Sequence, residues 1–331
     1  MEKTLNSEKK CWIAAPLVLT EILKKPNERN SHFFLYLNQI SFMNHRIKTF
    51  IFKCLDFLPS TIGYKIYHIL QNFSENKDVN RKIHSTESTF NEFVKICDTL
   101  KITINQKSII EIGSGWLPIF PYFLLYLGKV KKVFSFDLNE HYQKKAISSF
   151  NTLFAKNYNV VIDATTDNRF NLPSGIDYFP CQNIINSNIT DADIVFSRFV
   201  LEHVTPSDIF EMHKKFKSDL KKGTHIVHFI SPSDHRAYSD KSLSLQDFLK
   251  YSKQEWDSIQ TKFDYHNRLR LPQYLDIFKS LDLEVIYLTY DVTKEGTSSY
   301  DLFQKLEIHS DYKGFSTEKL TAGSINIVLK I

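Results

Sequence analysis

Two glycines and an acid form the arrangement with the clearest chemical use in this 331-residue chain. Gly113 and Gly115 flank Ser114 directly after a short β-branched apolar run, and Asp137 ends a second apolar run about twenty residues later. A glycine pair lets the backbone approach a ligand because no Cβ stands in the way. A carboxylate at the end of the next strand can accept hydrogen bonds from both hydroxyls of a ribose. The spacing therefore predicts a site for a nucleotide-like cofactor.

Two cofactors fit a glycine turn followed by a ribose-binding acid: a nicotinamide dinucleotide and S-adenosylmethionine. The dinucleotide fingerprint requires a third glycine, so that helix and strand pack closely around a pyrophosphate, but Pro118 occupies that position. Glu111 stands just before the first glycine and suits a ligand with an ammonium and a sulfonium better than one with phosphates. These two residues favour the methyl donor.

The elements that must position these residues alternate between strand and helix, which is typical of a parallel α/β sheet. Apolar runs predict strands at 108–110, 133–137, 176–181, 192–197, 224–230, 284–290 and 324–331. Helices are expected at 119–127, with Pro118 in the first helical position and Gly128 as its end, and at 141–156, 206–220 and 271–281. Thr205 has the spacing of a capping box for the third of these helices. The polar stretch 232–266, with a short helix near 245–251, is expected as an insertion over the strand ends.

Residues 1–100 show helical periodicity and no glycine-rich turn, so we expect a helical extension before a domain that covers 101–331. Helices are expected at 47–58, 61–73 and 89–100, with the polar segment 74–88 as a linker. The basic, aromatic-rich stretch 45–73 is expected either to pack against the following domain or to contact a membrane surface.

Composition narrows the class of protein. With 42% hydrophobic and 24% charged residues the chain can build a substantial core, and no run reaches the roughly 18 apolar residues of a membrane span. The N-terminus lacks an apolar segment after its charges, so we expect a cytoplasmic protein. A net charge of +5 without a Lys/Arg-rich run does not indicate nucleic acid. Four widely spaced cysteines, and two histidines on opposite faces of one strand (His225 and His228), predict neither a disulfide framework nor a metal site.

Four segments resemble, in order and spacing, the class I S-adenosylmethionine-dependent methyltransferases: 111–118, 136–138, 193–204 and 220–223. More narrowly, Gly-Trp-x-Pro after the turn, Ser-Arg before Leu-Glu-His-Val, and His228 through Asp234-His235 are similar to bacterial methyltransferases of uncertain substrate, some of which are associated with surface-polysaccharide gene clusters. The resemblance covers roughly 105–331. It implies an α/β fold with a Rossmann-like seven-stranded sheet in the order 3-2-1-4-5-7-6, whose last strand is antiparallel.

The same resemblance implies a set of cofactor-binding residues. Glu111, Gly113 and Gly115 would hold the methionine part of the donor, Asp137 the ribose, and Gln182 or Asn183 the edge of the adenine. Ser114, Leu138 and Ser197 complete the expected set. Many relatives carry an acid after the third strand, where this chain has Cys181-Gln182-Asn183, so the adenine contact is its clearest departure from the family pattern.

The acceptor is expected at the ends of the fourth and fifth strands. Arg198 is interpreted either as a binding group for an anionic acceptor or as the ion-pair partner of Glu202, and Asn267 and Arg268 are candidates for the same mouth. If the acceptor is a hydroxyl, one group must take its proton, and histidine, with a pKa of about 6.5, suits this role. The candidates are His235 or His228 assisted by Asp234, and then His203.

The sequence thus predicts a methyltransferase that uses S-adenosylmethionine and transfers the methyl group to an oxygen of a glycan, a lipid-linked sugar or a small molecule. One alternative is an NAD(P)-dependent oxidoreductase, although the chain lacks both the third glycine and a Tyr-x-x-x-Lys pair after the fourth strand. Another alternative is a non-catalytic binding or scaffold protein with a methyltransferase fold. The sequence indicates neither the acceptor atom nor the oligomeric state.

Overall fold

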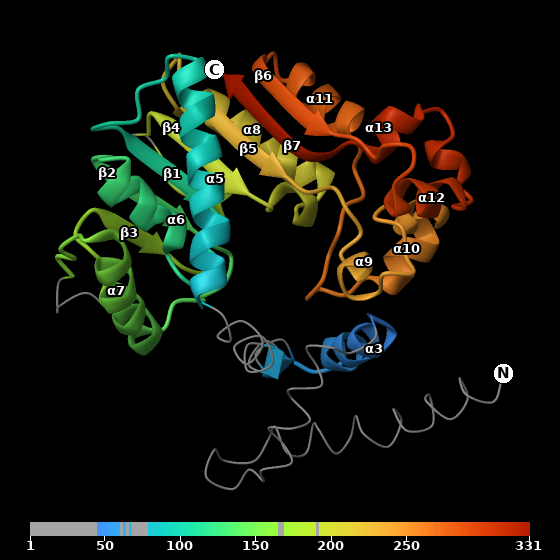
Figure 1. Ribbon diagram of the computed structural model, residues 1–331, viewed down its shortest axis with the longest axis horizontal. Helices are drawn as coiled ribbons and strands as arrows, with labels where there is room; N and C mark the ends of the chain where they lie inside the picture. Colours follow the sequence, from blue (N-terminus) through green and yellow to red (C-terminus); the bar gives the residue numbers. More distant parts are fainter. Residues whose placement is uncertain (1–44, 60–61, 64–65, 68–78, 165–168, 190–191) are drawn as a thin grey trace, which may run out of the picture. The chain divides into compact units, whose positions relative to one another are not determined.

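The structure is a computed structural model that describes residues 45–59, 62–63, 66–67, 79–164, 169–189 and 192–331 (Figure 1). The chain divides into two compact units, each assembled from segments that are distant in the sequence. The sheet unit comprises Asn80–Pro232, Asn267–Thr293 and Phe315–Ile331. The insert unit comprises Met1–Val79, Ser233–His266 and Lys294–Gly314.

The sheet unit is built on one seven-stranded sheet in the order β3-β2-β1-β4-β5-β7-β6. Its strands are β1 (Ser108–Ile112), β2 (Lys132–Phe136), β3 (Ile176–Phe179), β4 (Ile194–Arg198), β5 (His225–Ile230), β6 (Glu284–Asp291) and β7 (Gly323–Lys330). Neighbours are parallel except that β7 runs antiparallel to both β5 and β6. The order and the single antiparallel strand implied by the resemblance are therefore confirmed.

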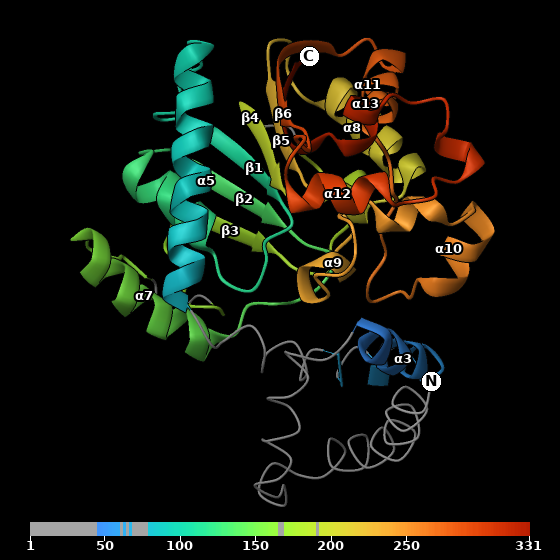
Figure 2. The ribbon, with the colours of Figure 1, turned by 45° about the vertical axis from the view of Figure 1, so that its right-hand side comes forward.

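Helices cover both faces of this sheet, which explains why the central strands read as continuous apolar runs. One face carries α5 (Val79–Thr99), α6 (Ile119–Tyr122), the π-helical turn η2 (Phe123–Leu127) and α7 (Lys144–Tyr158). The other carries α8 (Pro206–Asp219) and α11 (Leu271–Ser280). Aromatic rings join the first layer to β4, where Phe196 stacks on Phe120 at 4.0 Å and meets Phe93 of α5 edge-on at 5.2 Å. Figures 1 and 2 both show α5 lying across this face.

The position of α5 corrects the predicted linker. Residues 79–88, expected to be part of a polar connection, form the first half of a 21-residue helix. Ile83, Phe90, Phe93 and Cys97 recur at helical spacing and are all buried. The numerous polar side chains of the segment occupy the remaining faces of the helix. The composition of the segment is therefore polar although one face of the helix is apolar. The helix belongs to the sheet unit, although it precedes the expected domain start at 101.

The helix after the glycine turn also differs in detail. Pro118 is the N-cap rather than the first helical residue, with φ −77° and ψ 48°, and the helix begins as α6 and then widens into the π-helical η2. Gly128 ends it with a right-handed φ of −76°. A Cβ at Gly128 would lie 2.7 Å from the carbonyl oxygen of Leu124. Close backbone approach, and not a left-handed turn, is therefore the reason for glycine here.

Other expected boundaries agree with the structure to within a few residues. The Thr205 hydroxyl accepts the Asp208 N–H at 3.1 Å and caps α8, as the spacing predicts. Short turns complete the sheet unit: η3 (Ile184–Asn186), η4 (Leu201–His203) and α13 (Thr317–Thr321).

The helices of the insert unit whose bounds are described are α3 (His45–Asp56), α9 (Arg236–Ser239), η5 (Asp247–Lys250), α10 (Lys253–Ile259), α12 (Ser298–Gln304) and η6 (Ser310–Tyr312). The helix expected near 245–251 is the 3₁₀ turn η5, whereas α9, α10 and the contribution of 294–314 were not predicted. α3 packs on the insertion through Phe52 and Phe263, whose ring centroids are 6.2 Å apart. The Lys262 ammonium lies 3.7 Å from the Asp56 carboxylate across the same contact.

Most of the second expected helix, 61–73, lies outside the described residues, so the expected membrane contact of 45–73 stays a prediction. Every helix in the described part of the chain is too short or too polar to cross a bilayer.

Candidate cofactor site

The turn after β1 has the geometry expected of a ligand-binding loop. Gly113 and Gly115 have φ of +80° and +60°, a region that residues with a Cβ rarely adopt. At Gly113 a Cβ would meet Val200 Cγ2 at 2.5 Å, so the turn is packed tightly on the segment after β4. At Gly115 a Cβ would have no neighbour within 4 Å. The first glycine is thus required by the protein interior, and the second leaves an open approach to the backbone.

Asp137 follows β2 directly, and its carboxylate points at this turn. Oδ2 accepts the backbone N–H of Ser114 at 2.9 Å and the Ser114 hydroxyl at 3.1 Å. Oδ1 accepts the N–H of Asn139 at 2.9 Å and lies 3.5 Å from Nε2 of His141. Oδ1 accepts one of these backbone hydrogen bonds and has a second lone pair, and the Ser114 hydroxyl has another acceptor in the Gly115 carbonyl at 3.2 Å, so the carboxylate is oriented and still has acceptor capacity for hydroxyl groups.

Glu111 is buried near the carboxyl end of β1, which lies between β2 and β4 in the sheet. Its Oε2 accepts the hydroxyl of Ser135 on β2, and burial raises the pKa of the carboxyl to about 8. The neighbouring Asp137 charge raises this pKa further, whereas the Ser135 hydrogen bond lowers it. The phenol of Tyr142, also buried, has its pKa raised by the same environment. Glu111 is therefore largely protonated at neutral pH and would ionise beside a cationic ligand.

Leu138, expected in the cofactor site, and Gln182 and Asn183, expected at the adenine edge, follow the ends of β2 and β3. The Leu138 side chain is 65% exposed. Gln182 is exposed, and its backbone N–H is bonded to the Asp137 carbonyl at 3.0 Å. The Asn183 side chain caps η3 by accepting the Ile185 N–H at 3.0 Å, which leaves its amide NH₂ available as a donor.

Ser197 does not face this turn. It is fully buried at the end of β4, and its hydroxyl lies 2.7 Å from Nδ1 of His228 on β5. His228 Nε2 in turn lies 2.9 Å from Nε2 of His213 on α8, and His213 Nδ1 lies 2.7 Å from the carbonyl oxygen of Ile209. The Ser197 side chain, expected at the cofactor, is instead the first member of an internal chain of hydrogen bonds.

The Ile209 carbonyl at the end of this hydrogen-bond chain determines which nitrogen of each histidine carries the hydrogen. The Ile209 carbonyl can only accept, so His213 carries its hydrogen on Nδ1 and accepts at Nε2. His228 must then donate from Nε2, and its Nδ1 accepts from the Ser197 hydroxyl. Burial lowers the pKa of His213 to about 4, and burial together with His213 lowers that of His228. Both rings are fully buried and neutral, so His228 does not present a nitrogen to an acceptor.

The segment after β4 is held by hydrogen bonds from Asn267, which we call the Asn267 clasp. The Asn267 NH₂ donates to the carbonyls of Leu201 at 2.6 Å and Val204 at 2.8 Å, and its Oδ1 accepts the Leu269 N–H at 2.9 Å. Its backbone N–H donates to the Glu202 carbonyl at 2.9 Å. The side chain that was expected to contact substrate therefore has its donors and its acceptor engaged within the protein. Its neighbour Arg268 is 4% exposed, with a left-handed φ of 59°, so it does not offer the solvent-facing cation that was expected.

Glu202 lies inside that clasp and was considered in the sequence only as a partner for Arg198. It is fully buried, and its Oε1 accepts the Ser231 N–H at 3.3 Å, whereas no partner is found for Oε2 within the described residues. Burial raises the pKa of this carboxyl to about 8. Arg198 does not pair with it. The Arg198 guanidinium donates to the hydroxyls of Ser85 at 2.8 Å and Thr86 at 3.4 Å on α5.

Arg198 keeps an unusual environment for a cation. Its guanidinium lies over the ring of Phe199 at 4.6 Å, and no carboxylate is within ion-pair distance in the part of the chain that the structure describes. Burial lowers the pKa of the guanidinium from its ordinary value. A half-buried cation with only hydroxyl partners is a suitable binding group for an anion.

The remaining candidates for a base belong to different units. Asp234, in the insert unit, is 1% exposed and forms a bidentate ion pair with Arg236, whose Nη2 lies 2.6 Å from Oδ2. The carboxylate is thus saturated by Arg236 and does not orient His235. The His235 ring stacks on Tyr238 at 5.1 Å and is half-buried. His203, on η4 of the sheet unit, is exposed.

Ser135 and His213 were not predicted from the sequence as members of these networks, and the burial of Glu202 was not predicted either. Ser135 alternates with apolar residues in β2, and a hydroxyl in a buried strand next to Glu111 would have been the available signal. Glu202 and His213 lie in otherwise amphipathic segments, and nothing in their spacing indicates that they are fully buried.

Comparisons with known proteins give the following matches. No family model matches the chain, and neither does any curated protein. The solved structure of magnesium protoporphyrin IX methyltransferase from Synechocystis with bound SAH is 10% identical over 76% of this chain and 83% of that chain, with a TM-score of 0.43. A SAM-dependent methyltransferase from Methanosarcina mazei is 14% identical over 70% and 97%, with a TM-score of 0.39. A candidate methyltransferase from Bacillus halodurans is 16% identical over 73% and 98%, with a TM-score of 0.42. Similarity this low carries no argument about the site, whose chemistry rests on the geometry of the turn after β1.

Proposed function

We propose that this protein is an S-adenosylmethionine-dependent methyltransferase that methylates an oxygen atom of a glycan, a lipid-linked sugar or a small molecule. The observation that carries the proposal is the turn after β1. Gly115 leaves its backbone open, and the Asp137 carboxylate is fixed against Ser114 with capacity for further hydroxyl donors. Exposed Leu138 beside it offers apolar surface to an adenine ring, and buried Glu111 offers a carboxyl to the ammonium of the donor.

The start of α6 argues against a dinucleotide. Pyrophosphate binding uses free backbone N–H groups at a helix N-terminus. Here Pro118 has none, and the Ile119 N–H already donates to the Leu117 carbonyl at 2.8 Å. A donor whose charged groups are an ammonium and a sulfonium does not need such N–H groups.

Catalysis by such an enzyme would come mainly from alignment. The methyl carbon must lie in line between the donor sulfur and the acceptor oxygen, and holding this geometry supplies most of the rate. For a hydroxyl acceptor, a base removes the proton as the carbon–oxygen bond forms. With His228 internal and Asp234 paired to Arg236, the two remaining candidates named from the sequence, His203 and His235, are the proposed candidates for this base.

Arg198 indicates the charge of the acceptor. Its guanidinium lies at the carboxyl end of β4, where ligands of open α/β sheets bind, and its hydrogen-bond partners in the described part of the chain are two hydroxyls. We expect an acceptor with a phosphate or carboxylate near the methylated oxygen. Arg198→Lys keeps the charge but loses the planar fork. It should raise the KM for such an acceptor with little change in the affinity for the donor.

Calorimetry separates the three hypotheses: a methyltransferase, an NAD(P)-dependent oxidoreductase and a non-catalytic scaffold. We expect S-adenosylmethionine and S-adenosylhomocysteine to bind and NADH not to bind. Binding of NADH alone would establish the oxidoreductase, and absence of binding by both methyl-donor forms would overturn the proposal. If the donor binds, mass spectrometry of surface glycans and lipids from a deletion strain should reveal a missing methyl group, whereas unchanged methylation of these and of small-molecule extracts would favour a scaffold.

A further inference from the structure

The insert unit contains a pocket of which the proposed function uses only His235, as a candidate base. Its walls come from α3, through Thr49 and Phe52, and from the insertion between β5 and α11. All residues that line it belong to this one unit. The wall is fixed by the Phe52–Phe263 contact and by the Lys262–Asp56 ion pair. The pocket is therefore a built feature of the unit.

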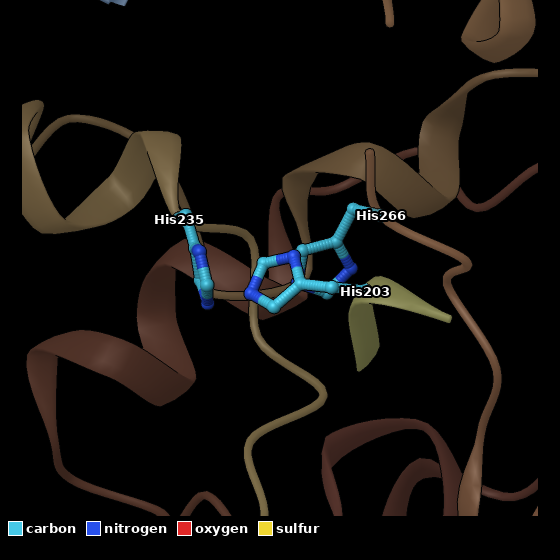
Figure 3. Close-up of side chains that lie close together, drawn as sticks. All are labelled: His203, His235 and His266. Carbon is cyan, nitrogen blue, oxygen red and sulfur yellow. The ribbon is translucent and has the colours of Figure 1, made fainter. Parts of the chain in front are cut away.

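Two imidazoles meet in this pocket. The rings of His235 and His266 are 4.8 Å apart between centroids and nearly perpendicular, at 84°, and one nitrogen of each lies within 4.8 Å of the other (Figure 3). Both rings are held by aromatic neighbours: His235 stacks on Tyr238, and His266, 4% exposed, packs on Phe248 at 5.4 Å. Figure 3 also labels His203, which belongs to the sheet unit.

The charges around the pair favour a cation. The pocket is lined by two carboxylates, Asp234 and Asp264, and by one guanidinium, Arg236. Arg236 is turned toward Asp234 and Asp247 and lies over the ring of Trp256 at 5.0 Å, so its charge is already compensated. With neutral imidazoles the lining keeps one net negative charge. Hydroxyl and amide oxygens from Thr49, Thr261 and Gln260 line the same space.

We propose that His235 and His266 bind a divalent first-row transition metal, with Zn²⁺ as the probe of choice. A tetrahedral ion at about 2.0–2.1 Å from each nitrogen needs the two nitrogens to be about 3.4 Å apart. The pair reaches this separation by small rotations of the His235 side chain, whose ring is only half-buried. Imidazole nitrogens suit zinc, copper and nickel, and the remaining coordination positions go to oxygen ligands such as water or a hydroxyl of a bound molecule.

The metal site has one consequence that rests on the proposed function. A metal-bound imidazole cannot accept a proton, so a metal on His235 removes this residue from the candidates for the base. An ion with open coordination positions would also lower the pKa of a hydroxyl bound to it.

The test uses the full chain, freed of metal by a chelator and dialysed. Zn²⁺ is titrated by calorimetry, and Co²⁺ by its visible spectrum, which reports nitrogen coordination. We expect one Zn²⁺ per chain, an affinity reduced about ten-fold or more by His235→Gln or His266→Gln, and no specific binding by the double variant. His309→Ala removes another histidine of the same unit, outside the pocket lining, and should bind like the unmodified protein.

Thermal unfolding in chelator verifies that each variant is folded. Glutamine is chosen because it keeps a polar side chain of similar size in place of each histidine. Wild-type Zn²⁺ affinity in the double variant would overturn the proposal, as would absence of binding by the unmodified protein up to about 1 mM Zn²⁺. Binding of S-adenosylmethionine, measured on the same samples, keeps a failure of the metal site distinct from a failure of the methyltransferase proposal.

Discussion

The turn after β1 and the turn after β4 lie at the same edge of the sheet but use their polar groups in opposite ways. After β1, Gly115 has open space beside it, and Asp137 retains acceptor capacity. After β4, the Asn267 clasp occupies the carbonyls of the turn, and Ser197 is bonded inward to His228. The first turn is prepared for a ligand, and the second is largely satisfied by the protein itself.

Each turn has a buried glutamate, and the pair shows what this difference means. Burial raises the pKa of both Glu111 and Glu202 to about 8. Glu111 is partnered by a hydroxyl and lies beside the proposed site for a cationic donor, which would ionise it. Glu202 is enclosed among backbone groups and has no such ligand in the proposal. Equal shifts in pKa therefore do not mean equal roles, because the role depends on what can reach the group.

Gly113→Ala should have the largest effect on the free energy of unfolding. It disturbs the contact of Gly113, in the turn after β1, with Val200 in the segment after β4. A Cβ at this residue is strained at a φ of +80° and meets Val200 Cγ2 at 2.5 Å. We expect a loss of about 3 kcal/mol in the free energy of unfolding, from backbone strain together with overpacking. Urea denaturation gives the value, and Val200→Ala in the same chain should restore part of it. Gly115→Ala meets no neighbour, so it should cost only the strain, about 1 kcal/mol, and mainly weaken donor binding.

Asp137→Asn should reduce the affinity for S-adenosylmethionine about 100-fold, because two charge-assisted hydrogen bonds to ribose hydroxyls are weakened. The matched control is Asp193→Asn, an acid that precedes β4 and pairs with Lys107 and Lys221. Calorimetry should show wild-type donor affinity for the control. Equal losses in both variants would mean that the turn after β1 is not the donor site.

The two glutamates give a test by pH. Their carboxyls have a folded-state pKa of about 8 against an ordinary value of 4.5, so the folded state holds protons that the unfolded chain releases. Their contribution to stability is full below pH 4.5 and is lost as pH rises toward 8. Glu111→Gln and Glu202→Gln should each flatten this decline and raise the unfolding free energy at pH 8 by about 2 kcal/mol.

Donor binding then separates the two glutamates. A cationic donor should ionise Glu111, so binding at pH 7 should release up to one proton, measured as a calorimetric heat that depends on the buffer. Glu111→Gln should abolish this release and Glu202→Gln should not. Proton release that persists in Glu111→Gln would show that Glu111 is not the group that the donor's ammonium ionises.

The smallest effect is expected in the internal hydrogen-bond chain of Ser197, His228 and His213. Burial lowers the pKa of His213 to about 4, so its contribution to stability is present above the ordinary value of 6.5 and is lost as pH falls toward 4. His213→Phe should remove this acid sensitivity and cost about 1 kcal/mol at pH 7, because Nε2–H of His228 loses its acceptor. Acid titration of the unfolding free energy checks both. Donor binding should be unchanged, and a large loss of it would connect the internal chain to the cofactor.

Local pattern accounts for the parts of the fold that the sequence predicted. The strands have runs of Ile, Val and Phe long enough to identify, and Thr205 and Gly113 carry signals that need no partner elsewhere in the chain. Two predictions were wrong: residues 79–88 of the predicted linker are helical, and helix α10 was not predicted. In both segments most residues are polar, and the apolar face is short. Asn267 shows the limit most clearly. Nothing in its surroundings in the sequence indicates that it binds carbonyls more than sixty residues away.

The sequence by itself determined the order of strands and helices, the glycine turn and the acid that follows it, since each depends on residues that are close in the chain. The tertiary structure alone decided which polar groups are already satisfied. Ser197, His228 and His213 come from three elements, and their hydrogen-bond chain exists only once β4, β5 and α8 are packed together. The same holds for the pocket around His235 and His266, whose walls join α3 to an insertion almost two hundred residues later. Periodicity records burial along one element, whereas a site is defined by contacts between elements, and those contacts leave no local pattern.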